Sequence, residues 1–310
     1  MQADNQTATT ALPAVLAVCV NWNGLHVLPA ALQGLTSSTY PNLRVVVVDC
    51  ASQDGSESLV SPDVTLIRLE ENRGYAGAIN AALLETEQFS HPGASLGRPD
   101  FFLLLNNDVE VAPDLIGELV RFASRQGPCV CGPQVVVHST PGRLEASWGR
   151  VDWSHVLARF EDRNRPLESI ADQEARKVQL LLGCALLIDS RALESTGLWD
   201  ETFFMYHEEV DWLYRCQMTG VPVFYCPFVR ILHHGGTGTK DAPLKKTYWL
   251  RRNTVFFLRK HRAGLVRWSI WATTLAGSLV RNLITLQWKR LGMICRGAWH
   301  GFRLARSNRS

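Results

Sequence analysis

Four apolar runs of strand type alternate with helical patterns in the first half of the chain, and this alternation restricts the fold more than any other feature. The runs are AVLAVCV (14–20), LRVVVVD (43–49), VTLIRL (64–69) and FFLLLNND (101–108). Residues at helical spacing, or residues that typically start helices, follow each run. Strands that alternate with helices predict a parallel sheet covered by helices. We therefore expect the α/β fold class with a mostly parallel central sheet.

Polar residues stand where these strands end. Asn21, Asp49 and Asp108 occupy such positions, and a further acidic cluster lies in FFMYHEEVDWLYR (203–215). Ligands bind beyond the carboxyl ends of the strands in sheets of this kind. A lone carboxylate after a strand is usually a cap or turn residue. Several acidic clusters at one edge can instead hold a divalent cation and a ribose, and leave one carboxylate as a base.

The net charge of +3 conceals a strong asymmetry along the chain. The segment from Lys240 to Ser310 contains 16 basic residues and one acid, a net +15, so the remainder carries −12. Five of the ten Trp residues also fall in this segment. Basic residues at helical spacing among aromatics are typical of an interfacial helix on an anionic membrane. Two alternatives stay open, a helical pair packed on the rest of the chain and a homodimer contact. Nucleic acid is disfavoured because the acidic remainder would repel phosphates.

The other compositional signals predict an intracellular protein of three parts. The eight cysteines lie mostly in apolar runs without C-x-x-C spacing, which favours reduced core thiols. The N-terminus lacks the basic residues of a signal peptide, and no apolar stretch reaches the roughly 18 residues of a membrane span. We expect a disordered N-terminus (1–13), a main domain (14–262) and a basic amphipathic helical tail (263–310). The polar middle (143–177) shows no regular pattern.

Seven segments provide a more specific indication through their order. They are VNWNG, VVDCASQDGS, ENRGYAGAIN, LLLNNDVEV, LLGCALLID, GLWDETFFMYHEEVDWLYR and HHGGTGT. The order resembles the family-two glycosyltransferases of GT-A fold, in their rhamnosyltransferase-like branch, over roughly residues 14–262. The resemblance implies transfer of a rhamnose-like or other hexose from a nucleotide diphosphate donor to an acceptor hydroxyl, with inversion.

The resemblance also implies roles for individual residues. It assigns the nucleotide to Asn21, Asn23, Asp49, Ser52, Arg73, Gly74, Asn80 and Asn107. It assigns Mg²⁺ or Mn²⁺ to Asp108 and His233, with His234 as the register alternative and Asn106 in place of the first acid of the DXD motif. It places the catalytic base at Glu209, beside Glu208. It assigns the acceptor or the diphosphate to Trp199, Asp211, His234, Arg251 and Arg252. Core packing for Trp199 and a helix-start role for Asp211 are the alternatives.

The chemistry requires residues of these types independently. Displacement at an anomeric carbon passes through an oxocarbenium-like transition state, and a carboxylate base must activate the hydroxyl on the opposite face. A divalent cation stabilises the diphosphate leaving group. We expect a dTDP- or UDP-sugar donor and a lipid-linked or glycan acceptor, at the cytoplasmic face of a bacterial membrane. The rival functions are a nucleotidyltransferase, whose phosphate loop the segment 21–24 does not resemble, and a membrane-bound sugar-nucleotide sensor without activity.

Overall fold

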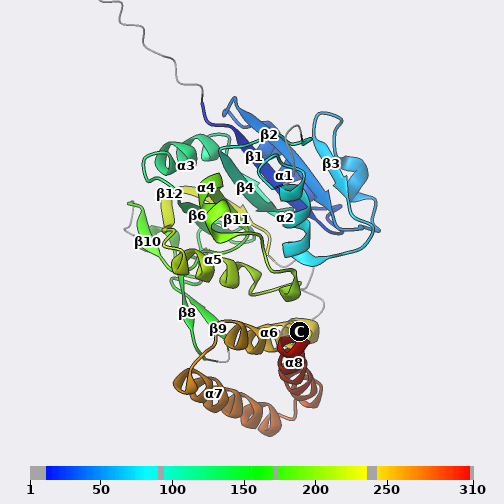
Figure 1. Ribbon diagram of the computed structural model, residues 1–310, viewed down its shortest axis with the longest axis vertical. Coiled ribbons are helices and arrows are strands. Elements are labelled where there is room, and N and C mark those ends of the chain that lie inside the picture. Colours follow the sequence, from blue (N-terminus) through cyan, green and yellow to red (C-terminus); the bar gives the residue numbers. More distant parts are fainter. Residues whose placement is uncertain (1–11, 90–93, 155, 171–173, 236–242, 308–310) are drawn as a thin grey trace, which may run out of the picture.

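A computed structural model describes residues 12–89, 94–154, 156–170, 174–235 and 243–307 of the chain (Figure 1). The segment 1–13, predicted to be disordered, lies outside these residues except for its last two. The carbonyls of Leu12 and Pro13 accept hydrogen bonds from Asn42 and Tyr40, so these two residues are held against the body.

A ten-stranded mixed sheet forms the centre of the protein, with strand order β10-β12-β6-β11-β4-β1-β2-β3, β5 beside β12 and β7 beside β6. Its strands are β1 (Val15–Asn21), β2 (Leu43–Asp49), β3 (Thr65–Arg68), β4 (Phe101–Asn106), β5 (Val109–Val111), β6 (Val130–Val137), β7 (Leu144–Ala146), β10 (Arg176–Val178), β11 (Ala185–Asp189) and β12 (Val223–His233). The β1–β2, β2–β3, β1–β4 and β6–β12 pairs are parallel, whereas β11 runs antiparallel between β4 and β6. The predicted mostly parallel sheet is therefore confirmed.

Helices cover both faces of the sheet because each carries an apolar stripe toward it (Figure 1). On one face lie α1 (Leu28–Thr36) and α3 (Leu115–Ala123), and on the other α2 (Gly74–Leu84), α4 (Ser190–Thr196) and α5 (Glu208–Met218). In α1 the leucines at 28, 32 and 35 are buried, as their helical spacing predicts. The short 3-10 helices are η1 (Ser56–Leu59), η2 (Leu167–Ser169) and η3 (Glu201–Phe203).

Three C-terminal helices form a further layer at one end of the molecule: α6 (Pro243–Lys260), α7 (Leu265–Ile284) and α8 (Trp288–Ser307) (Figure 1). Helix α6 joins this layer to the body, since Phe256 and Phe257 belong to the main core. Helix α8 approaches α6 very closely at Gly297 and Gly301. A Cβ atom there would lie only 2.5 Å from the Tyr248 carbonyl oxygen and 2.4 Å from that of Arg252.

The tail also contacts the body through α7. The guanidinium of Arg267 lies 3.7 Å from the ring centre of Trp153, in the hairpin of β8 (Gly149–Asp152) and β9 (Leu157–Phe160). This contact and the α6–α8 packing show that the tail helices pack on the rest of the chain, one of the two open alternatives. No helix among the described residues has the length and apolar character that crossing a membrane requires.

Candidate active site

A cavity of about 330 Å³ opens at the edge of the sheet where β1, β4 and β12 end. Strand-end residues form part of its wall, and the segment that leads into α5 forms another part. Its lining includes Val20, Trp22, Cys50, Asn72, Gly74, Tyr75, Asn106, Asn107, Asp108, Glu145, Leu182, Gly183, Cys184, Met205, Tyr206, Glu208, Glu209, His233 and Lys246. The cavity therefore brings together the predicted metal ligands, Asp108 and His233, and the predicted catalytic pair, Glu208 and Glu209.

A buried hydrogen-bond network joins the ends of three strands. The side-chain amide of Asn21 donates to Asp49 Oδ1 at 2.8 Å, and to the hydroxyls of Ser52 and Ser56 at 3.3 and 2.9 Å. Its carbonyl oxygen accepts a hydrogen bond of 2.8 Å from Asn107. Asn21 and Asp49 are fully buried, and of these five residues Asn107 lines the cavity. The contacts of Asn21, Asp49 and Ser52 thus fix the loops that surround the cavity.

The loop after β1 forms part of the cavity rim. The backbone N–H of Asn23 donates to the Ser52 hydroxyl, and its side-chain oxygen accepts from the backbone of Gln53, both at 2.9 Å. These bonds tie the loop after β1 to the loop after β2. Trp22, the residue between the end of β1 and Asn23, is 37% exposed and lines the cavity. An exposed indole at this place offers a flat surface for a planar ring, and no sequence pattern predicted this role for it.

Asp108, His233 and Glu145 form a chain of contacts that fits a metal site. His233 Nε2 lies 3.3 Å from Asp108 Oδ1, and His233 Nδ1 lies 2.5 Å from Glu145 Oε2. A metal-binding histidine commonly holds a carboxylate on its second ring nitrogen, which leaves the first free for the ion. Burial acts to lower the pKa of His233, but the hydrogen bonds and charges of Asp108 and Glu145 raise it to about 9. The buried ring thus sits in a strongly negative environment, which also favours a bound cation.

Glu145 was not predicted from the sequence. It lies on the short edge strand β7, within the polar middle, and alternates there with the buried Leu144 and Ala146. A period of two over three residues is too short to distinguish a strand from a loop. Its partner His233 is 88 residues away, so only the folded chain reveals the pair.

The segment ENRGYAGAIN packs against the loop that precedes Glu208 and Glu209. Gly74 has a φ of +73°, and a Cβ atom there would lie 2.0 Å from the carbonyl oxygen of Phe204. The same oxygen accepts a hydrogen bond of 3.1 Å from the backbone of Tyr75. Gly74 is therefore required by this close approach of two backbones, and it also lines the cavity.

Two other predicted nucleotide ligands contact the segment around η3. Arg73 forms an ion pair with Glu201 at 2.7 Å. Asn80 is buried, and it accepts from the backbone N–H of Trp199 and donates to the Trp199 carbonyl and to Glu201. Trp199 is itself buried and stacked on Trp212 at 5.3 Å. The contacts of these residues connect α2 to η3. None of the three belongs to the described residues that line the cavity.

The adjacent Glu208 and Glu209 both line the cavity, in different electrostatic conditions. Burial raises the pKa of Glu208 well above its ordinary range, and the neighbouring charge of Glu209 raises it further. Burial also raises the pKa of Glu209, while backbone hydrogen bonds act to lower it. When two neighbouring carboxyls share one proton, the proton is held by the carboxyl whose ionised form is less stabilised. The pKa of Glu208 is raised the more strongly of the two, so Glu209 remains the predicted base of the pair.

Gly183 leaves room for Glu209. A Cβ atom at position 183 would lie 2.9 Å from Cβ and 3.1 Å from Cγ of Glu209, closer than unbonded carbons approach. The Tyr75 hydroxyl donates to the Gly183 carbonyl at 2.9 Å, which holds this backbone in place. The glycine in the predicted apolar run LLGCALLID is therefore explained by the side chain that it faces.

The loop before Glu208 is strained and is held by α6. Phe204, Tyr206 and His207 have φ angles of 61°, 65° and 70°, which cost side-chain-bearing residues about 1 kcal/mol or more each. The side-chain amide of Asn253 donates to the carbonyls of Phe203, Met205 and Tyr206 at 2.8, 2.8 and 2.6 Å. Since Asn253 is fully buried, this clamp sets the path of the chain that leads to the predicted catalytic pair.

We predict that Asn253→Asp lowers kcat by about 100-fold, because a shift of about 1 Å in a catalytic group has that effect. The variant keeps the side-chain shape but loses the N–H donors to the carbonyls of Phe203, Met205 and Tyr206. The KM for the donor should change little, since the clamp contacts the loop of the base. Asn282→Asp, at another buried asparagine of the C-terminal layer, is the matched control. It should lower the melting temperature without changing kcat, and an equal loss of kcat in both variants would contradict the clamp.

Of the other predicted acceptor residues, His234 follows β12 and contacts Glu110 outside the cavity lining, whereas Asp211 lies in the packing between α5 and the C-terminal helices. Asp211 is fully buried and bonds to Lys260 and His261, both at 2.8 Å. Burial alone would raise its pKa, but these partners and Arg215 lower it. Asp211 therefore links α5 to α6 within the interior, and its contacts are structural.

The two predicted arginines also lie in this layer. Arg252 donates to Asn253 Oδ1 at 2.6 Å and lies over the ring of Trp249. Burial, together with the charges of Arg290 and Arg281, lowers the pKa of Arg251 to about 10. Neither arginine is among the described residues that line the cavity. Lys246 supplies a positive charge there.

Comparison with known proteins shows what the chain is similar to. A family model described as "Glycosyl transferase family 2" matches residues 17–176. The chain is 29% identical to N-acetylglucosaminyl-diphospho-decaprenol L-rhamnosyltransferase of Mycobacterium tuberculosis, over 80% of this chain and 84% of that protein. It is 22% identical to the low-salt glycan biosynthesis hexosyltransferase Agl10 of Haloferax volcanii, over 61% and 58%.

Solved structures share the fold. GalNAc-T7, determined with UDP, GalNAc and Mn²⁺, has a TM-score of 0.61 at 17% identity and matches 80% of this chain and 48% of its own. The mannosyltransferase PcManGT of Pyrobaculum calidifontis, in complex with GDP-Man and Mn²⁺, has a TM-score of 0.57 at 17% identity, over 94% and 88%. The GT-A arrangement predicted from the sequence is thus the arrangement observed.

Proposed function

Because the chain belongs to glycosyl transferase family 2, we propose that it transfers a hexose, with inversion, from a nucleoside diphosphate donor to a hydroxyl of a lipid-linked glycan. One observation carries this proposal: Asp108, His233 and the Glu208–Glu209 pair meet in one cavity at the edge of the sheet. The rhamnosyltransferase relative, named for an N-acetylglucosaminyl-diphospho-decaprenol, supports a rhamnose-like sugar and a lipid-linked acceptor. Synthesis of a bacterial cell-surface glycan is the corresponding role.

The residues of the cavity have separate proposed roles. Asp108 and His233 would hold Mg²⁺ or Mn²⁺, and Glu145 would hold His233 by its other nitrogen. Such a cation supplies charge neutralisation for the diphosphate leaving group. Trp22 and Asn107, which line the cavity, would contact the nucleotide, and Lys246 adds a positive charge to the lining. Glu209 takes the proton of the attacking hydroxyl, while neutral Glu208 beside it avoids a second negative charge.

Transfer with different donors tests the proposed function. The purified protein should transfer sugar from a dTDP- or UDP-hexose to a polyprenyl-diphosphate-linked acceptor with Mn²⁺, and EDTA should abolish the transfer. The true donor should also raise the melting temperature, since a ligand at 100 times its Kd adds about 2.7 kcal/mol to the free energy of unfolding. A donor that binds without any transfer would favour the sensor, and diphosphate release from a nucleoside triphosphate and a sugar phosphate would favour the nucleotidyltransferase.

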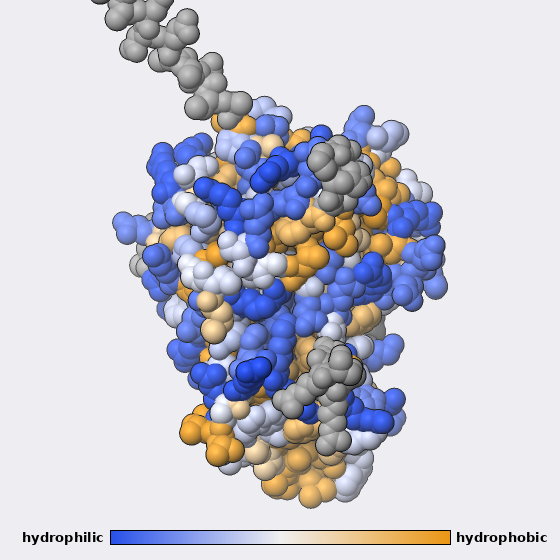
Figure 2. All heavy atoms as spheres, in the orientation of Figure 1, coloured by the Kyte–Doolittle hydropathy of each residue, from blue (hydrophilic) through white to orange (hydrophobic). Residues whose placement is uncertain are grey.

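We further propose that the outer face of the tail lies on an anionic membrane at the cytoplasmic side. Figure 2 shows apolar residues gathered at the end of the molecule that α7 and α8 form. Large apolar residues exposed there are Leu265, Val266, Ile270, Val280, Leu283, Ile284, Leu286, Trp288, Trp299 and Phe302. On the same two helices the basic residues Arg281, Lys289, Arg290, Arg296 and Arg303 are also exposed. Apolar and basic side chains on one surface fit the interface of an anionic bilayer.

The double variant Val266→Glu and Ile284→Glu should lose sedimentation with vesicles that contain phosphatidylglycerol. Each of these side chains is about three-quarters exposed, and its burial in lipid would contribute about 1.5–3 kcal/mol. Met218→Glu is the matched control, because Met218 is 71% exposed on α5. Unchanged vesicle binding by the double variant would contradict the membrane surface. If that variant instead converted a dimer to a monomer in sedimentation velocity, the face would be a homodimer contact.

A further inference from the structure

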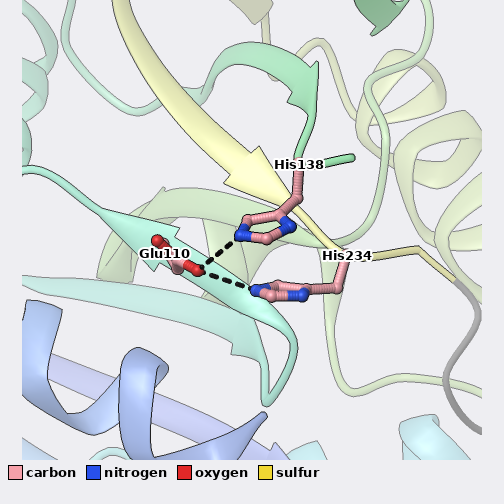
Figure 3. Close-up of side chains that lie close together, drawn as sticks. All are labelled: Glu110, His138 and His234. Carbon is pink, nitrogen blue, oxygen red and sulfur yellow. Dashed lines mark hydrogen bonds and ion pairs between the residues drawn. The ribbon is translucent and has the colours of Figure 1, made fainter. Parts of the chain in front are cut away.

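Two histidines and a glutamate converge on the strands that carry the donor site, but outside the cavity lining. His138 follows β6, His234 follows β12, and Glu110 lies on β5. Oε1 of Glu110 lies 2.7 Å from Nε2 of His234 and 3.2 Å from Nε2 of His138 (Figure 3). The two imidazole rings are stacked, with centres 3.6 Å apart. One potential ligand atom from each residue thus falls within 4.8 Å of the others.

We propose that Glu110, His138 and His234 form a second metal site, which takes a zinc-class divalent cation. Two imidazoles and a carboxylate are a ligand set that zinc uses, with Zn–N distances of about 2.0–2.1 Å. The three atoms are close enough for one ion after small side-chain rotations. An imidazole binds a metal in its own plane, so the two rings, now 18° from parallel, tilt toward each other. The fourth position is open to water.

The chemistry of this set differs from that of the donor site. Mg²⁺ and Mn²⁺ prefer carboxylate and carbonyl oxygens, whereas imidazole suits zinc and its neighbours. Two of the three ligands here are imidazoles, and the site therefore selects against the ion proposed for Asp108 and His233. The cluster is partly exposed, with side-chain exposures of 40% for His138, 33% for Glu110 and 22% for His234. An ion can reach it directly from solvent.

Two backbone hydrogen bonds connect the second site to the donor site. The N–H of His234 donates to the Asp108 carbonyl at 2.9 Å, and the N–H of His138 donates to the His233 carbonyl at 3.0 Å. An ion on Glu110, His138 and His234 would cross-link the ends of β5, β6 and β12. Its role is structural, because it would stiffen the strand ends from which Asp108 and His233 extend. The site does not depend on the proposed function, which places the donor-site ion on Asp108 and His233. His234, which the sequence offered as the register alternative and as a contact to the acceptor or diphosphate, lies on Glu110 instead of lining the cavity.

Zinc titration of the nucleotide-free protein tests the second site. All variants carry Cys295→Ser, because Cys295 is an exposed thiol that can bind zinc by itself. After treatment with a chelator, the parent should bind one Zn²⁺ in competition with a chromophoric chelator, and its melting temperature should rise. His138→Gln and Glu110→Gln should each weaken zinc binding by more than about 100-fold, since changes to outer-shell residues alone already cost about 10–100-fold. Both positions are partly exposed, so the variants should fold.

Two controls separate this site from other zinc binding. His26→Gln removes an exposed histidine elsewhere, and Asp108→Asn removes a ligand of the donor site. Both should bind zinc as the parent does. The proposal is overturned if the parent binds no stoichiometric zinc, or if Asp108→Asn loses zinc while His138→Gln retains it. Neither result bears on sugar transfer, which is measured separately with Mn²⁺ and donor.

Discussion

Glu209→Gln is expected to lower kcat for sugar transfer by about 10²–10⁴-fold, the usual contribution of a general base. The amide has nearly the same shape as the carboxylate but cannot accept the proton of the attacking hydroxyl. Donor affinity, measured by calorimetry with Mn²⁺, should remain within about twofold, because Glu209 serves the acceptor side of the reaction. Rates measured in single turnover separate the chemical step from product release.

Glu208→Gln is the matched control for the base. Burial and the charge of Glu209 raise the pKa of Glu208 well above its ordinary range, which favours its neutral form. We therefore expect the uncharged amide to replace it with a much smaller loss of rate. The same argument predicts the acid limb of the wild-type pH profile. The base must be ionised, and its raised pKa means that activity is lost, as pH falls, at a higher pH than an ordinary glutamate would give. Glu209→Gln with full activity, or Glu208→Gln with the larger defect, would reassign the base.

Asp108→Asn should remove transfer almost completely, with a loss of roughly 10³-fold, because charge neutralisation by a metal contributes several kcal/mol. Asp108 is buried. Among the described residues that line the cavity, it is the only aspartate. Asn106 and Asn107 beside it offer only neutral oxygens. The Mn²⁺ concentration needed for half-maximal donor binding should rise steeply in the variant.

Glu145→Gln provides the graded comparison for Asp108→Asn. Glu145 contacts His233 Nδ1 rather than the position of the ion, and outer-shell changes typically cost about 10–100-fold in metal affinity or activity. Its defect should therefore be smaller than that of Asp108→Asn and should be relieved at high Mn²⁺. If Asp108→Asn retained the full rate of transfer and EDTA still inhibited it, the ion would bind elsewhere.

The edge of the sheet that carries the site could be predicted from the sequence. Asn21, Asp49 and Asp108 directly follow apolar strand runs, and parallel strands present their carboxyl ends at one edge. The register bears this out, since Asn21 pairs with Asp49 and Val20 with Asn106. The order of short motifs was sufficient for the family, because each motif is continuous in the chain.

Which of these side chains face the cavity could not be predicted. Asp49 is a carboxylate after a strand, as Asp108 is, yet it is enclosed by Asn21 and Ser52. Asp211 lies two residues after Glu209, on another side of the same helix, and bonds inward to Lys260 and His261. Residue type and spacing are nearly the same in each comparison. Residues from other helices and strands decide which of these carboxylates is enclosed and which faces the cavity.

The sequence by itself determined the α/β class, the family and the set of candidate acids, because periodicity and motif order are local properties of the chain. Only the tertiary structure decided how the site is held. Glu145 contacts His233 across 88 residues, and Asn253 reaches the Phe203 carbonyl across 50. Such contacts depend on how strands and helices dock. A polar residue in a stretch without periodicity has no local pattern that names its distant partner.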